Sequence, residues 1–98
     1  MAPVLTPRQR ARLKADAHRL PTVVQVGQSG LTDAIGTEVD RSLAAHRLIK
    51  IKLPAADRAG RDAIATALSE RTGAAVVGQV GRVLILWRPR PDDQPLEP

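Results

Sequence analysis

An unbroken apolar run, Val-Leu-Ile-Leu-Trp at residues 83–87, lies near the end of this 98-residue chain. A strand with this composition is typically central in its sheet and covered on both faces. Residues 75–80, which include three valines, form another predicted strand, and only Gly81-Arg82 separates the two. Glycine in the first of these positions suits a tight hairpin turn. The sequence therefore predicts a hairpin whose second strand (residues 83–88) lies inside a larger sheet.

Two further strands are predicted upstream. Residues 22–26 are rich in β-branched side chains, which favour strands. From Ile49 to Leu53, apolar residues alternate with lysines, and this pattern indicates a strand (residues 48–53) with one buried face and one wet face. Pro54 ends the run.

Start and stop signals mark three helices. Thr6, followed by Pro7 and Gln9, forms a capping box for a helix that we expect to end near Arg19, before Pro21. Thr32 can cap a second helix that runs to about His46. Asp57 can cap a third that runs to about Thr72, with Gly73 as its C-terminal stop.

The predicted order is helix, strand, helix, strand, helix, strand, strand. Strand–helix–strand crossovers imply parallel pairing, and the hairpin adds an antiparallel pair. We therefore predict an α/β domain with a mixed four-stranded sheet and three helices over residues 1–89. Residues 90–98 contain three prolines and three acids, and we expect them to form a disordered Pro-rich acidic tail.

Composition narrows the possible environments and partners. The chain has no cysteine, and Trp87 is its only aromatic residue. No apolar run is long enough to span a membrane, and the N-terminus does not resemble a signal peptide. We expect a cytoplasmic protein.

Three of the ten acids lie in the last seven positions, so the preceding 91 residues carry 15 basic against 7 acidic side chains. Such an excess favours a polyanionic partner, nucleic acid first.

The motif of most interest is Gly27-Gln28-Ser29-Gly30, between a predicted strand and a predicted helix. The first N–H groups of a helix lack intrahelical partners and, with the helix dipole, favour an anion. Glycines let a phosphate backbone approach closely. An isolated GxxG more often makes only a turn. It is too short for a dinucleotide fingerprint, and no Gly-Lys-Ser/Thr follows it.

Basic residues elsewhere favour the anion-binding interpretation. Arg8 and Arg12 share one face of the first helix, and Lys14 lies on a neighbouring face. Lys50 and Lys52 point to the same side of their strand. We expect phosphates to contact the loop and the start of the second helix, within a field of basic side chains; the candidate residues are Gly27, Gln28, Ser29, Gly30, Thr32, Arg8, Arg12, Lys14, Lys50 and Lys52.

Several segments together resemble one family. They are Leu13 to His18, the helix start Leu31-Thr32-Asp33-Ala34-Ile35, the strand His46-Arg47-Leu48-Ile49-Lys50-Ile51-Lys52, Thr72 to Ala75, and the closing Gly81-Arg82-Val83-Leu84-Ile85-Leu86-Trp87-Arg88-Pro89. In this order they resemble the CRM-domain family, in particular its bacterial single-domain YhbY-type members. The similarity runs from about Leu5 to Pro89.

The resemblance implies a fold similar to the C-terminal domain of bacterial translation initiation factor three. It also implies RNA binding through the GxxG loop and nearby basic residues, and association with ribosomal RNA in precursors of the large ribosomal subunit. We expect a monomer without metal, cofactor or small-molecule substrate. The family often has a basic residue inside the loop, where this chain has Gln28-Ser29; one phosphate interaction is then missing or supplied by the first helix.

Other classes of function remain as alternatives. An enzyme is the least favoured, because Ser29 does not stand in a Gly-x-Ser-x-Gly elbow and no cluster has metal-ligand spacing. A basic protein-interaction module remains open. So does another nucleic-acid-binding regulator without a ribosomal role. A KH domain is disfavoured, because its GxxG loop joins two helices and this loop follows a strand.

Overall fold

The computed structural model describes residues 2–96 and confirms the predicted order of elements. The elements are α1 (Pro7–Ala17), β1 (Thr22–Gln25), α2 (Asp33–His46), β2 (Leu48–Lys52), α3 (Arg58–Thr72), β3 (Ala75–Val80) and β4 (Val83–Trp87). Helix α1 ends two residues earlier than expected. His18 and Leu20 continue it as a tight turn, with N–H groups that donate to the carbonyl oxygens of Ala15 and Ala17. β1, β2 and β4 each end one residue earlier than expected.

The four strands form one mixed sheet in the order β1-β2-β4-β3. β1 and β2 pair in parallel, and β4 pairs antiparallel with both β2 and β3. The predicted apolar strand therefore lies in the interior of the sheet, between β2 and β3. Its middle residues Leu84, Ile85 and Leu86 are at most 4% exposed. This burial matches the expectation of a central strand covered on both faces.

Each face of the sheet has its own apolar cluster. On one face, Ile49, Ile51, Leu84 and Leu86 pack under α2 and α3 with Val39, Leu43, Ala65 and Leu68. On the other, Ala75, Val77 and Ile85 pack under α1 with Leu13 and Ala17. Period-two alternation along each strand sends neighbouring residues to opposite clusters. The molecule is thus a three-layer structure with one helix on one face and two on the other.

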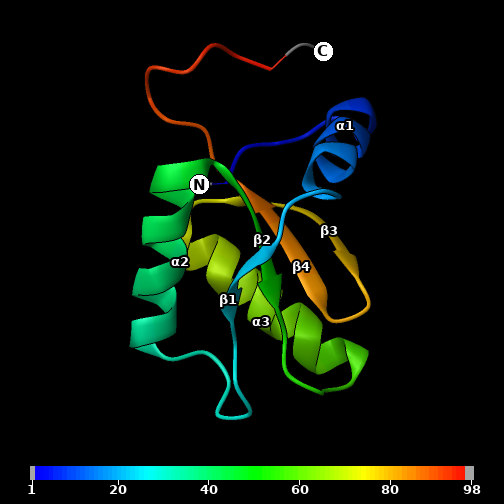
Figure 1. The fold of residues 1–98 in the computed structure, drawn as a ribbon, viewed down its shortest axis with the longest axis vertical. Coiled ribbons are helices and arrows are strands. Elements are labelled where there is room, and N and C mark those ends of the chain that lie inside the picture. Colours follow the sequence, from blue (N-terminus) through cyan, green and yellow to red (C-terminus); the bar gives the residue numbers. More distant parts are fainter. Residues whose placement is uncertain (1, 97–98) are drawn as a thin grey trace.

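The single helix α1 covers its face only in part. It packs against β2, β3 and β4, and Figure 1 shows it beside the upper end of the sheet, away from the loop between β1 and α2 at the bottom. A helix with its side chains is about 10 Å wide, whereas four strands about 4.8 Å apart make a wider surface. α1 therefore covers only part of this face, and the rest of the face stays open.

Local signals in the sequence explain the ends of the elements. The Thr6 hydroxyl accepts from the N–H of Gln9 at 3.1 Å, and the Gln9 side chain accepts from the N–H of Thr6 at 2.9 Å, which completes the predicted capping box. Gly73 ends α3 with a φ of 73°, and Gly81 begins the hairpin turn with a φ of 59°. Glycine adopts such backbone more readily than any other residue.

Truncation of the central strand tests this architecture. Because the Leu84 side chain is fully buried against α2 and α3, Leu84→Ala is expected to lower the free energy of unfolding by about 2–5 kcal/mol. Urea denaturation measures the change. The matched control is Val4→Ala, at a position that is 94% exposed, where less than about 0.5 kcal/mol is expected. Equal effects of the two substitutions would contradict the buried position of β4.

Candidate functional site

The GxxG segment forms a tight, open loop that leads into α2. The N–H of Gly30 donates to the carbonyl oxygen of Gly27 at 3.0 Å, and Gly30 has a φ of 79°. A Cβ added at either glycine would meet nothing within 4 Å. Gln28 and Ser29 are exposed. The glycines thus make the turn and also leave the backbone of the loop accessible.

Thr32 begins α2 as its N-cap. Its hydroxyl accepts from the N–H of Ile35 at 3.2 Å. The cap satisfies one of the N–H groups that lack an intrahelical partner in the first turn, and the others remain oriented along the helix axis. Asp33, the first helical residue, also pairs with Arg71 of α3. An ion pair on the surface thus links the start of α2 to α3.

Parallel pairing brings Lys52 of β2 close to the loop, whereas Lys50 pairs with Thr22 at the start of β1. The N–H of Val26, directly before Gly27, donates to the carbonyl oxygen of Lys52 at 2.8 Å. Ile49 and Ile51 are buried under α2 and α3, so the alternation of the strand turns Lys50 and Lys52 toward the α1 face. This placement agrees with the predicted wet side of the strand.

Two further cations extend this basic surface. Lys14 of α1 lines the same pocket as Lys50. Arg82, in the hairpin turn, lies beside Leu53. The carbonyl oxygen of Arg82 accepts from the N–H of Leu53 at 2.7 Å, and the Nε of Arg82 donates to the carbonyl oxygen of Leu53 at 3.1 Å. We call Lys14, Lys50, Lys52 and Arg82 the basic strip. Within residues 2–96, none of these four side chains forms an ion pair with a carboxylate.

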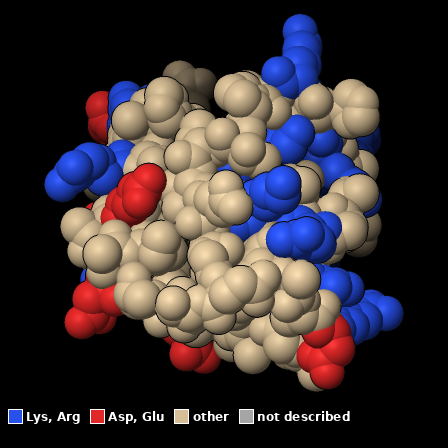
Figure 2. All heavy atoms as spheres, turned by 60° about the horizontal axis from the view of Figure 1, so that its bottom comes forward, with Lys and Arg blue, Asp and Glu red and all other residues tan. Residues whose placement is uncertain are grey.

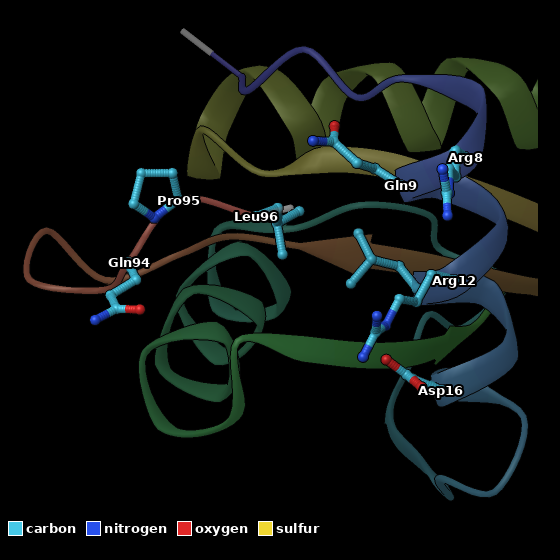
Figure 3. A pocket seen from close by; sticks show the side chains of 8 residues that line it. Arg8, Gln9, Arg12, Asp16, Gln94, Pro95 and Leu96 are labelled. Carbon is cyan, nitrogen blue, oxygen red and sulfur yellow. The ribbon is translucent and has the colours of Figure 1, made fainter. Parts of the chain in front are cut away.

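Arg8 and Arg12, in contrast, lie on the other side of α1. Together with Asp16 they line a separate cleft of about 390 Å³ between α1 and the C-terminal segment. Figure 3 shows the two arginines projecting from successive turns of α1, with Gln94, Pro95 and Leu96 across the cleft. The buried stripe of Leu13 and Ala17 separates this side of the helix from Lys14. The structure thus divides the predicted cluster of cations between two clefts.

Most remaining arginines near α2 and α3 have intramolecular partners. Three pair with carboxylates (Arg47 with Asp93, Arg71 with Asp33, and Arg88 with Asp40). Arg90 donates to the carbonyl oxygens of Ala44 and Ala45 near the end of α2. Figure 2, turned so that the bottom of Figure 1 comes forward, shows lysine and arginine side chains gathered on the right side of the molecule, whereas most acids in view lie elsewhere. The basic strip is thus one of several places within the described residues where cations lack a carboxylate partner, and it is the one next to β2 and the loop.

The segment after β4 makes several contacts with the domain. Leu96 packs against the cluster under α1. Asp93 accepts hydrogen bonds from Arg47 Nε at 2.5 Å, Arg47 Nη2 at 2.7 Å and the N–H of Arg90 at 2.7 Å. Arg47 is the single residue between α2 and β2, with a φ of 63°. The disordered tail expected at residues 90–98 stays a prediction, and its last two residues lie outside the described part of the chain.

Residues 2–96 offer neither a metal centre nor a membrane span. No group of three or more His, Cys, Asp or Glu side chains in this range is arranged to hold a metal ion. No helix in it is long and apolar enough to cross a membrane.

Comparison with known proteins assigns the family. The CRS1 / YhbY (CRM) domain matches residues 5–88. The chain belongs to this family. The match covers every strand and helix and ends just after β4, which agrees with the resemblance drawn from the separate sequence segments.

Relatives and a solved structure are consistent with this assignment. A Haemophilus influenzae protein named "RNA-binding protein" is 40% identical over 85 residues, which cover 87% of this chain and 86% of that protein. A "probable RNA-binding protein" from Bacillus subtilis is 26% identical over 96% of this chain and 98% of its own length. The solution structure of a Staphylococcus aureus protein superposes with a TM-score of 0.82 at 24% identity, covering 96% of this chain and 98% of that one, and shows that the two share a fold.

The contact between Arg47 and Asp93 predicts a pH dependence of stability. Hydrogen bonds from Arg47, and then from the Arg90 N–H, hold the pKa of Asp93 below its usual value. Since the folded state lowers this pKa, the contribution to stability is present above the unfolded value of about 3.9 and is lost as pH falls through the folded value. Asp93→Asn, measured by thermal unfolding, is expected to lower Tm at neutral pH, and its deficit against the wild type should shrink in acid. A deficit that stays constant down to pH 2 would contradict the ionic contact.

Proposed function

We propose that this domain binds RNA through the GxxG loop, the start of α2 and the basic strip. We further propose that its RNA is ribosomal, in precursors of the large ribosomal subunit, and that the monomeric protein assists their assembly in the cytoplasm without a cofactor. Family membership and the names of its relatives support RNA as the partner. The ribosomal role extends the resemblance of the sequence to YhbY-type proteins.

The observation that carries the proposal is the basic strip, a group of four cations that lie on or next to β2 without carboxylate partners in the described part of the chain. Intramolecular carboxylates neutralise three arginines around α2 and α3. The basic strip has no such partners in residues 2–96, and Lys52 lies beside the residue that enters the loop. Unpaired cations in a row attract a phosphate backbone and release its counterions on binding. Lys50 and Lys52 are about 7 Å apart along their strand, because each residue of a strand advances about 3.3 Å.

The loop supplies a different kind of contact from the strip. Its glycines present bare backbone, and α2 begins three residues after Gly30 with its dipole directed at the same place. A phosphate can approach there without displacing a side chain. Gln28 and Ser29 carry no charge. Strand pairing places Lys52 of β2 next to Val26, so Lys52 is the member of the basic strip that lies nearest to the loop. The strip thus compensates for the missing basic residue in the loop.

The recognition that we propose reads mainly backbone and shape. Phe and Tyr are absent from the chain, and Trp87 packs against the apolar cluster under α1. Extended stacking on aromatic platforms, which single-strand binders commonly use, is therefore not available. Phosphates and 2′-hydroxyls remain as the principal contacts.

Salt dependence tests the electrostatic basis of the proposal. About four phosphate contacts predict that the association constant falls with roughly the third power of salt concentration. Lys50→Gln with Lys52→Gln should weaken binding and reduce that exponent by about 0.7 for each phosphate that is no longer neutralised. Filter binding or fluorescence anisotropy with a fragment of 23S ribosomal RNA measures both quantities.

Arg41→Gln is the matched control for this experiment. Arg41 is an exposed cation on α2, away from the basic strip, so its removal should leave the exponent unchanged. A control variant that binds as weakly as the lysine variant would place binding elsewhere. An acidic protein that displaces the RNA completely from the same face would instead support the protein-interaction alternative.

A pair of substitutions at Gly30 tests the loop. Gly30 has a φ of 79° and open space around its side-chain position, and both Asp and Asn tolerate such backbone better than other residues. Both variants are therefore expected to fold. Gly30→Asp adds a negative charge at the proposed phosphate position and should weaken RNA binding at least tenfold, whereas Gly30→Asn, of similar shape, should weaken it much less. If the two variants bind alike, the loop does not contact a phosphate.

A further inference from the structure

Two members of the basic strip, Lys14 and Lys50, line a pocket. It has a volume of about 230 Å³ and lies between the end of α1 and the β3–β4 hairpin. Lys14, His18 and Lys50 line its polar side. Its other lining residues are apolar, namely Ala17, Val80, Val83 and Ile85. The pocket is therefore an apolar surface with cations and an imidazole at its rim.

The lining residues differ in solvent exposure, so that buried residues form the floor of the pocket and exposed residues form its rim. Ala17 and Ile85 are 0% and 4% exposed and belong to the cluster under α1. Val80, in contrast, is 55% exposed and is among the few large apolar side chains open to solvent in residues 2–96. Lys14 passes over Gly78, with its Cδ 3.8 Å from the position that a Cβ would take there. The aliphatic part of Lys14 thus lies close to β3.

We propose that this pocket receives one unstacked base of the bound RNA, while Lys14 and Lys50 contact the phosphates on either side of it. The inference rests on the proposed function and adds a subsite to it. Charge complementarity supports this occupant, because two cations stand at the rim of a surface that is otherwise apolar. Size supports it too, since pockets for drug-sized ligands measure about 300–1,000 Å³ and this one is smaller.

The chemistry of a base matches the lining. Its faces are apolar and polarisable, and single-stranded regions of RNA are recognised through bases turned out onto aromatic or apolar side chains. The exposed imidazole of His18 offers the only aromatic surface in the pocket. Trp87 lies at the opposite end of β4 from Val83, so the single large ring of the chain does not take this role.

The near absence of aromatic residues makes the proposal directly measurable by NMR. A base in the pocket would shift the methyl signals of Val80, Val83 and Ile85 through its ring current, and no Phe or Tyr in the chain contributes a competing effect. The probes are a mixed-sequence single-stranded RNA oligonucleotide and inorganic polyphosphate, a polyanion without bases. RNA is expected to shift the three sets of methyl signals, and polyphosphate is expected to shift only the backbone signals of the loop and the basic strip.

His18→Ala provides the matching affinity test, with His46→Ala as its control. His46 is the other histidine of the chain and lines a different pocket, near β1. Loss of His18 should weaken RNA binding about tenfold, within the range for one stacked base, and leave the affinity for polyphosphate unchanged. The control variant should behave as the wild type with both probes.

The outcomes separate this subsite from the proposed function. Suppose that RNA binds with the expected salt dependence, that the methyl signals do not shift, and that His18→Ala binds RNA as tightly as the wild type. The subsite is then wrong, and the proposal of RNA binding stands. If the wild type binds no RNA, both are wrong. If nucleoside monophosphates at millimolar concentration shift the same methyl signals and RNA does not, the pocket is a site for free nucleotides, which overturns its assignment to a strand of RNA.

Discussion

The alternation of β2 is the constraint on which both faces of the molecule depend. Ile49 and Ile51 are fully buried under α2 and α3, and a slip of one residue in the register of β2 would place lysines in that core. Uncompensated buried charge is far more costly than any surface contact. The register is therefore fixed, and with it the direction of Lys50 and Lys52. The apolar half of the strand builds the core, and its polar half forms part of the basic strip.

The unequal covering of the sheet then creates the open surface. Two helices cover one face, whereas α1 alone packs on the other, against β2, β3 and β4. The part of that face nearest the GxxG loop keeps exposed cations and the half-exposed Val80 instead of a helix. Apolar and charged groups lie together there because no second helix within residues 2–96 covers this face of the sheet. This combination suits a ligand with apolar bases and an anionic backbone.

Local signals in the sequence sufficed for the elements but not for the arrangement of charges. The capping residues Thr6, Thr32 and Asp57 each stand where the helices begin, because a cap acts within one turn. The pairs Arg47–Asp93 and Arg88–Asp40 span 46 and 48 positions, and no local pattern marks them. The helical pattern of Leu13 and Ala17 indicates which side of α1 meets the sheet. It does not indicate where α1 lies relative to the loop, so the sequence predicts Arg8 and Arg12 beside the loop although they line another cleft.

This sorting of the cations changes how the net charge is to be interpreted. A count of 15 basic side chains overstates the field available to a polyanion, because the arginines paired with Asp33, Asp40 and Asp93 serve the fold. Arginine suits that role, since its planar group donates several hydrogen bonds at once. Three of the four members of the basic strip are instead lysines, whose compact charge on a flexible stem follows a phosphate without a fixed geometry. The strip holds all three lysines of the chain, and this flexible cationic chemistry supports the proposal that RNA lies over the strip.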